Sequence, residues 1–254
     1  MSGRLTVIGL GPGSARQVTP EATAAVAEAG FFYGYKPYLD RLDLRADQTR
    51  IASDNREELA RAAAALEKAA GGHAVAVVSG GDPGVFAMAA AVCEAMEAGP
   101  QRWRDIGFTV VPGVTAMLAV AARAGAPLGH DFCAISLSDN LKPWAVIERR
   151  LKAAAEAGFV IALYNPVSRA RPKQLDTAFD ILRGVLPAAT PVIFGRAAGR
   201  PDERIDIRRL AEAGAGMADM ATCVIVGSTE TRTIDRNGRP PLVYSPRSWG
   251  RPAQ

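Results

Sequence analysis

Three loops rich in glycine and other small residues are the parts of this sequence whose residue types and spacing could bind a ligand. They span residues 9–14 (GLGPGS), 79–84 (SGGDPG) and 111–116 (VPGVTA). Each follows a short β-branched run that predicts a strand, and open α/β sheets bind ligands at the carboxyl ends of their strands. Since glycines let the backbone approach a ligand closely, these loops are the candidate binding site.

The first loop resembles a dinucleotide-binding turn but departs from that pattern at two points. The third glycine would fall at Ser14, and Tyr35 and Lys36, not an acidic residue, end the second predicted strand. Pro12 also removes one backbone donor that a phosphate would need. A nucleotide phosphate is therefore disfavoured, while a tight turn or a ligand loop of another kind remains open.

The second loop carries a carboxylate, Asp82, where the next helix is expected to begin. Asp82 is predicted to cap that helix, with Pro83 at its first position. A cap does not need the preceding pair Gly80-Gly81, so Asp82 also suits a ligand that carries hydroxyl groups or a positive charge. The third loop is equally compatible with a plain turn between a strand and a helix.

Composition excludes several kinds of site. The 254 residues are 48% hydrophobic and 22% charged with a net charge of +4, which describes a globular protein without a pronounced nucleic-acid-binding face. The cysteines (Cys93, Cys133, Cys223) and histidines (His73, His130) are few and far apart. We therefore expect no disulfide framework, no metal site and a reduced, cytoplasmic protein. No apolar run approaches the ~20 residues of a membrane span, and no signal peptide is expected.

Short β-branched runs alternate with alanine-rich amphipathic stretches, which is typical of an α/β fold. In the first half this pattern predicts a largely parallel sheet, with strands at 5–8, 31–33, 74–78 and 109–111. Helices are expected at 20–29, 54–70, 85–98 and 114–123. The first of them has Thr19 as its N-cap and Pro20 at its first position.

In the second half the predicted strands lie closer together, which favours a mixed sheet. They are expected at 132–137, 159–163, 192–194, 204–207 and 223–226, with helices at 143–157 and after Pro172. The segment 125–129 interrupts the pattern with glycine and proline, so we expect one domain at 1–127 and a second at 128–238. Residues 239–254 are expected to form an irregular tail.

Five segments, in this order and spacing, resemble the tetrapyrrole (class III) S-adenosylmethionine-dependent methyltransferases. They are residues 7–14 (VIGLGPGS), 79–86 (SGGDPGVF), 112–116 (PGVTA), 163–166 (LYNP) and 221–227 (ATCVIVG). The resemblance implies two α/β domains with the cofactor, S-adenosyl-L-methionine, in the cleft between them, and commonly a homodimer.

Position by position, the resemblance also implies site residues. Ten are expected to contact the cofactor: Pro12, Gly80, Gly81, Asp82, Val85, Thr115, Ala116, Asn165, Ala198 and Thr222. Four are expected to contact the substrate: Gly11, Gly13, Arg16 and Lys36. Arg16 and Lys36 would suit the carboxylates of a polyanionic tetrapyrrole.

Within the family, three longer segments resemble a C-methyltransferase of cobalamin biosynthesis that methylates carbon 17 of the macrocycle and contracts the ring. They are residues 33–39 (YGYKPYL), 130–139 (HDFCAISLSD) and 159–166 (FVIALYNP). Ring contraction needs a proton acceptor, for which His130 and Asp139 are the leading candidates, ahead of Asp82.

Several alternatives to this activity remain open. They are the cobalt-containing counterpart of this step, another corrin methylase, a ribosomal RNA or diphthine methyltransferase, and a noncatalytic tetrapyrrole-binding protein. We expect neither a nucleic acid nor a membrane as partner.

Overall fold

The structure of the chain is a computed structural model that describes residues 3–54 and 57–249. The chain folds as two compact units, Met1–Thr115 (unit 1) and Ala116–Gln254 (unit 2).

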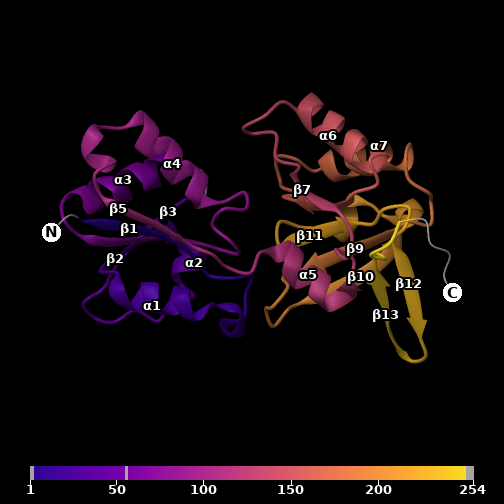
Figure 1. The fold of residues 1–254 in the computed structure, drawn as a ribbon, viewed down its shortest axis with the longest axis horizontal. Coiled ribbons are helices and arrows are strands. Elements are labelled where there is room, and N and C mark those ends of the chain that lie inside the picture. The colour runs from indigo at the N-terminus through magenta and orange to yellow at the C-terminus, as the bar shows by residue number, and fades with distance from the viewer. Residues whose placement is uncertain (1–2, 55–56, 250–254) are drawn as a thin grey trace. The chain divides into compact units, whose positions relative to one another are not determined.

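Unit 1 is built on a sheet of five parallel strands in the order β3-β2-β4-β1-β5 (Figure 1). This confirms the largely parallel sheet predicted for the first half. The strands are β1 (Arg4–Gly9), β2 (Phe31–Tyr35), β3 (Thr49–Ser53), β4 (Ala74–Ser79) and β5 (Gly107–Val111). Strand β3 was not predicted, because its sequence TRIAS is largely polar and lies at the sheet's edge.

Helices cover both faces of this sheet. Helices α3 (Glu58–Ala70) and α4 (Met88–Ala98) pack on one face and α1 (Pro20–Glu28) on the other, where the short helix α2 (Lys36–Leu39) also lies (Figure 1). Two 3-10 helices, Ala15–Gln17 and Gln101–Trp103, complete the described part of the unit. All the strands run the same way, so the loops after β1, β4 and β5 and helix α2 meet at one edge, the unit 1 loop edge.

The predicted start of α1 was right, whereas that of α3 was wrong. Thr19 caps α1 as expected, its Oγ1 accepting from the Ala22 amide at 3.0 Å. Helix α3 begins at Glu58 instead of Asp54, although the Asp54 amide donates to Glu57 Oε2 at 3.1 Å, as a capping box would. Residues 55 and 56 lie outside the described residues.

Unit 2 contains a mixed sheet in the order β10-β9-β11-β8-β7, as predicted. Strands β7 and β8 are parallel, and the other neighbours are antiparallel. The strands are β7 (Phe132–Ser136), β8 (Val160–Tyr164), β9 (Pro191–Arg196), β10 (Arg204–Arg209) and β11 (Thr222–Val226). Since β8 and β9 both run antiparallel to β11, the carboxyl ends of β7, β8 and β9 and the amino end of β11 lie at one edge, the unit 2 loop edge.

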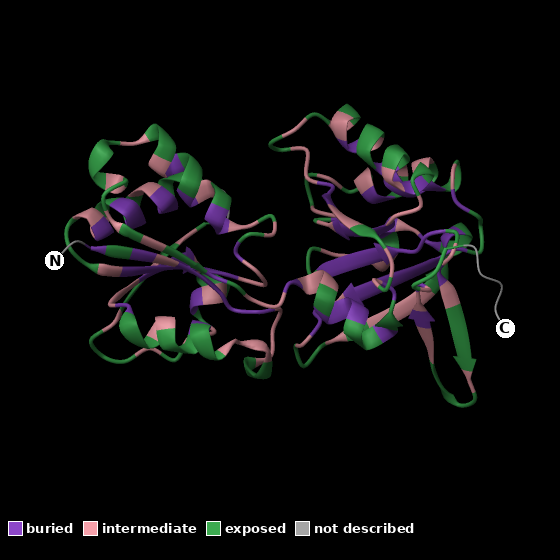
Figure 2. Cartoon of the chain, in the orientation of Figure 1, coloured by how far each residue is buried: buried purple, intermediate pink, exposed green. Residues whose placement is uncertain are grey.

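The core of unit 2 lies between this sheet and helices α6 (Trp144–Glu156) and α7 (Gln174–Arg183). The fully buried rings of Phe179 and Phe194 pack edge to face there, with centroids 6.0 Å apart. The central strands of the sheet are the most deeply buried (Figure 2). Two 3-10 helices, Leu210–Glu212 and Ala215–Met217, lie between β10 and β11.

The boundary between the units precedes the one expected after residue 127, because helix α5 (Ala116–Ala124) packs on the sheet of unit 2. Val120 of α5 is buried against Gly195 of β9, where an added Cβ would lie 2.1 Å from Val120 Cγ2. Alanine-rich helices look alike in sequence, so the pattern alone cannot tell which sheet this helix covers.

The expected irregular tail was wrong for its first residues. Strand β13 (Arg239–Tyr244) pairs with β12 (Arg232–Arg236) and, in parallel, with β6 (Gly125–Ala126), in a small three-stranded sheet (Figure 1). This strand was not predicted because prolines, which rarely occur inside strands, lie at its start. Among the described residues, no helix has the length and apolar character needed to cross a membrane.

Candidate functional site

The three ligand-loop candidates of unit 1 are hydrogen-bonded to one another at its loop edge. The amide of Gly11 donates to the Gly81 carbonyl at 3.1 Å, and the Gly81 amide donates back at 2.9 Å. The amide of Gly113 donates to Asp82 Oδ2 at 3.0 Å, joining the third loop to the second. The sheet order β4-β1-β5 explains this cluster, because it places the three strand ends side by side.

Asp82 does not cap a helix, contrary to expectation. Helix α4 begins six residues later, at Met88, and Asp82 instead accepts from the amides of Gly84 at 2.8 Å and Gly113 at 3.0 Å. This half-buried carboxylate therefore ties two loops together while adding a negative charge to the loop edge.

The glycines of this cluster are required because the loops pack closely against one another and against α2. An added Cβ at Gly113 would lie 2.3 Å from the Gly81 carbonyl oxygen, and one at Gly9 would lie 2.7 Å from the Gly113 nitrogen. At Gly80 an added Cβ would lie 2.6 Å from the ring of Tyr38 on α2. The loops can pack this closely only without side chains at these positions.

Two arginines that the sequence did not single out stabilise this edge. Arg41 donates to the carbonyls of Leu10 and, at 3.0 Å, of Gly11 in the first loop. Arg61 on α3 is 4% exposed and donates to Ser53 Oγ at 2.7 Å and to Met88 Sδ at 3.2 Å, linking the end of β3 to the start of α4. Burial lowers the pKa of Arg61, an effect that nearby acidic groups oppose.

The expected substrate contacts Arg16 and Lys36 are exposed side chains at the same edge. Lys36 Nζ lies 2.7 Å from Asp40 Oδ2, so part of its charge is already paired. Arg16 lies in the first 3-10 helix, after the loop that contains Gly11 and Gly13.

The expected cofactor residues of unit 2 gather at its own loop edge. Asn165 follows β8 and donates from Nδ2 to Ser136 Oγ, at the end of β7, over 2.9 Å. Thr222 begins β11, Ala198 follows β9, and Ala116 begins α5. The amide of Met117, in the first turn of α5, donates to the Tyr164 hydroxyl at 3.0 Å, which ties the end of β8 to this helix.

The hydroxyl of Thr222 is engaged within the protein. It donates to Asp219 Oδ1 at 2.8 Å and accepts from the Asp219 amide at 3.0 Å. Burial alone would raise the pKa of Asp219, but hydrogen bonds from Arg196 and Thr222 outweigh it and hold the pKa below its usual range. Asp219 is therefore ionised at neutral pH, and its hydrogen bonds to Thr222 stabilise the start of β11.

Backbone strain marks both loop edges. Among the described residues, three non-glycine residues have a positive φ: Phe86 at 51°, Asn165 at 51° and Ala197 at 49°. Asn165 is itself an expected cofactor contact, and the other two adjoin Val85 and Ala198. Such conformations cost about 1–3 kcal/mol each and concentrate at functional sites.

The two candidate proton acceptors lie at opposite ends of strand β7. His130 precedes the strand, where its Nδ1 accepts from the Asp131 amide at 2.8 Å and its ring lies 5.9 Å from that of Trp249. Asp139 follows the strand, on the loop edge that carries Asn165, and accepts from Gln174 Nε2 at 3.4 Å. Five residues of strand separate them by about 17 Å, so the structure does not bring this pair together.

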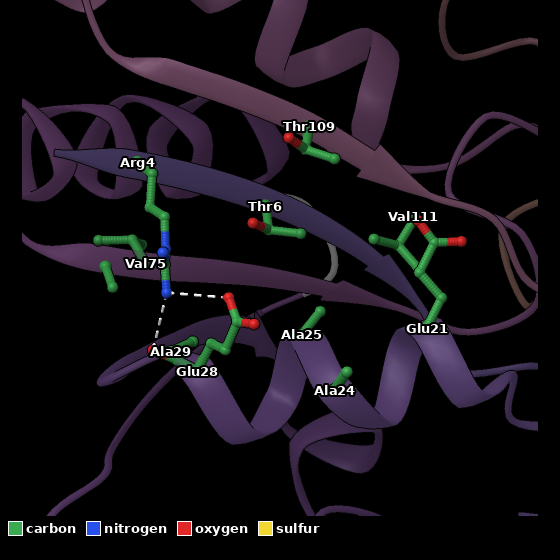
Figure 3. A pocket seen from close by; sticks show the side chains of 11 residues that line it. Arg4, Thr6, Glu21, Ala24, Ala25, Glu28, Ala29, Val75, Thr109 and Val111 are labelled. Carbon is green, nitrogen blue, oxygen red and sulfur yellow. Dashed lines mark hydrogen bonds and ion pairs between the residues drawn. The ribbon is translucent and has the colours of Figure 1, made fainter. Parts of the chain in front are cut away.

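One hollow in unit 1 lies away from the expected contacts. It has a volume of about 310 Å³ between α1 and strands β1 and β5, and Arg4 and Glu28 form an ion pair of 3.0 Å at its side (Figure 3). None of the expected site residues lines it. Within the described residues, no cluster of His, Cys, Asp or Glu side chains could hold a metal ion.

The sequence and this geometry agree with one known family. The family model of the tetrapyrrole (corrin/porphyrin) methylases matches residues 4–214. The chain belongs to this family.

Individual members of the tetrapyrrole methylases are similar over nearly the whole chain. The precorrin-3B C(17)-methyltransferase of a Sinorhizobium species is 69% identical, over 100% of both chains. A probable cobalt-factor III C(17)-methyltransferase of Salmonella typhimurium is 42% identical, over 96% of this chain and 99% of its own. The crystal structure of the methyltransferase CobJ is 51% identical, with a TM-score of 0.92, over 96% of this chain and 100% of its own.

Membership confirms the α/β tetrapyrrole methylase fold predicted from the sequence, together with the enzyme class. The chain is a methyltransferase that uses S-adenosyl-L-methionine as methyl donor. The noncatalytic tetrapyrrole-binding alternative is left without support.

Proposed function

We propose that the chain transfers a methyl group from S-adenosyl-L-methionine to carbon 17 of precorrin-3B, with ring contraction to precorrin-4, in cobalamin biosynthesis. The observation that carries this proposal is the 69% identity, over the full length of both chains, to a precorrin-3B C(17)-methyltransferase. The 42% identity to a cobalt-factor III C(17)-methyltransferase supports a second candidate, the same reaction on a macrocycle that already holds cobalt.

The proposed cofactor contacts fit this donor in their chemistry. A half-buried carboxylate, Asp82, suits ribose hydroxyl groups or a positive sulfonium, and the surrounding glycines offer backbone groups. The strained Asn165 and the small Ala198 mark the corresponding edge of unit 2. The full proposed set is Pro12, Gly80, Gly81, Asp82, Val85, Thr115, Ala116, Asn165, Ala198 and Thr222.

The donor supplies an electrophilic methyl group on a sulfonium whose leaving group is a neutral thioether. The bond from carbon 17 to the methyl forms as the sulfur–methyl bond breaks, so no residue has to protonate the leaving group. The protein's task is to hold the two reacting atoms in line at about 3–3.5 Å. The hydrogen bonds of Asp82 and those between Gly11 and Gly81 cross-link the loops and restrict their movement, which supports this role.

Ring contraction, unlike methyl transfer, requires a side chain that accepts a proton. A hydroxyl on carbon 20 becomes the carbonyl of the displaced acetyl group, so a proton must leave that oxygen. Of the two candidate acceptors, we propose Asp139, because it shares the loop edge of Asn165 whereas His130 lies at the other end of β7.

The substrate proposal places its carboxylates near Arg16 and Lys36, beside Gly11 and Gly13. We also propose a homodimer in the cytoplasm, with no nucleic-acid or membrane partner. The free thiols of Cys93, Cys133 and Cys223 support a reduced compartment.

The test begins with the product, S-adenosylhomocysteine, which is expected to bind one site per chain. At a concentration 100 times its Kd, it should stabilise the native state by about 2.7 kcal/mol, read as a higher Tm. Calorimetry gives the stoichiometry. No thermal shift and no binding at millimolar concentration would contradict the assignment of the methyl donor.

Incubation with S-adenosylmethionine and each macrocycle then decides the substrate. We expect precorrin-3B to gain the mass of one methyl group and to change its absorbance as the ring contracts. Turnover of cobalt-factor III alone would establish the second candidate instead.

The Asp139→Asn variant is expected to accumulate a methylated but uncontracted macrocycle. Removing a general base should slow contraction by about 10²- to 10⁴-fold while methyl transfer continues. His130→Ala is the matched control and should contract its product at the wild-type rate. Both variants must first bind S-adenosylhomocysteine normally. Slow contraction in His130→Ala, or normal contraction in Asp139→Asn, would refute the choice of Asp139.

A further inference from the structure

Arg171, on the loop after β8, carries a guanidinium group with one buried nitrogen that makes no hydrogen bond among the described residues. Its side chain is 14% exposed, and Nε donates to Ser168 Oγ at 3.3 Å. Its Nη1 is buried and has no hydrogen-bond partner among the described residues. An unbonded N–H of a buried cation costs free energy, so this group needs an acceptor.

The neighbouring carboxylate does not meet that need. Asp139 Oδ1 lies 3.8 Å from Arg171 Nε, which is beyond hydrogen-bond distance, and Asp139 Oδ2 accepts from Gln174 at 3.4 Å. Asp139 thus offers a loose electrostatic partner that holds Arg171 in place without saturating its donors.

The loop that carries Arg171 is closed by backbone hydrogen bonds and is positively charged. The backbones of Ser168 and Arg171 exchange two hydrogen bonds, of 3.0 and 3.2 Å, which close a tight turn. Residues 168–173 (SRARPK) contain three cations and no carboxylate. The turn lies on the loop that begins at Asn165, at the unit 2 loop edge, so this positive group shares a loop with a proposed cofactor contact.

We propose that Arg171 is the anchor of a carboxylate-binding subsite, which takes a side-chain carboxylate of the tetrapyrrole substrate. The planar guanidinium matches a carboxylate in shape and charge, and such charge-assisted hydrogen bonds are about twice as strong as neutral ones. The identity of the ligand rests on the proposed function, whereas the preference for a carboxylate follows from Arg171 itself.

Binding of uroporphyrin III, a stable tetrapyrrole with carboxylate side chains, tests the subsite by fluorescence titration. Arg171→Gln should raise the Kd about 10- to 100-fold, as expected for losing hydrogen bonds to a charged group. Arg169→Gln makes the same charge change on an exposed neighbour and should raise it about two- to threefold at most. Arg171→Lys keeps the charge and should recover part of the affinity. All three variants should bind S-adenosylhomocysteine like the wild type.

Equal weakening by Arg171→Gln and Arg169→Gln would overturn the subsite, as would absence of saturable binding to the wild type. If Arg171 served folding alone, Arg171→Gln would lower Tm and would weaken the binding of S-adenosylhomocysteine as well as that of uroporphyrin III. Arg171→Lys would then show no loss of uroporphyrin III affinity apart from its loss of S-adenosylhomocysteine affinity. If the wild type binds uroporphyrin III through Arg171 but does not methylate precorrin-3B, the proposed substrate is wrong and the carboxylate subsite stands.

Discussion

Replacing Gly113 with alanine is expected to lower kcat/KM about 100-fold, the scale of loss that a displacement of about 1 Å at a reacting centre produces. The new Cβ would lie 2.3 Å from the Gly81 carbonyl oxygen and 2.9 Å from the carbonyl carbon of Gly9. Both are backbone atoms, so no change of rotamer relieves the clash, and the second and third loops must separate. S-adenosylhomocysteine binding, measured by calorimetry, should weaken with the rate.

Gly30→Ala is the control for this substitution. It adds the same methyl group in unit 1, where the nearest atom, the Ala74 carbonyl oxygen, is 3.8 Å away. It should leave both the rate and the affinity near their wild-type values. Wild-type kinetics in Gly113→Ala would show that the contact between the loops does not set the geometry of the cofactor site.

Replacing Arg61 with alanine should lower the free energy of unfolding of unit 1 by about 3 kcal/mol, because several hydrogen bonds to a buried charged group are lost together. The guanidinium donates to Ser53 and to the Asp54 carbonyl as well as to Met88, and the buried Met88 sulfur would lose this donor. Urea denaturation followed by circular dichroism measures the loss.

Arg4→Ala provides the comparison for an exposed arginine of the same unit. Arg4 pairs with Glu28 at 3.0 Å, but both side chains are more than half exposed, so its removal should cost less than about 1 kcal/mol. Arg61→Lys should recover only part of the stability, since an ammonium group cannot reproduce the fork of donors. Equal losses for Arg61→Ala and Arg4→Ala would contradict a structural role for the buried group.

The sequence by itself determined the family, the class of enzyme and the α/β fold. These follow from local patterns: strands of β-branched residues, amphipathic helices, and short segments such as 79–86 (SGGDPGVF) that resemble those of the family and occur in the same order along the chain. The N-cap of α1 could also be predicted, because Thr19 and its hydrogen-bond partner Ala22 are three residues apart. Features whose partners are near in sequence could therefore be predicted.

Only the tertiary structure decided how the candidate residues are used. Asp82 was expected to cap a helix but bonds to Gly113, 31 residues away, and this depends on β4 and β5 flanking β1. His130 and Asp139 are nine positions apart in sequence, yet strand β7 holds them at opposite ends. The burial of Arg61 and the unbonded donor of Arg171 likewise depend on which elements pack around them. Strand order and packing arise from contacts distant along the chain, which spacing between neighbouring residues does not encode.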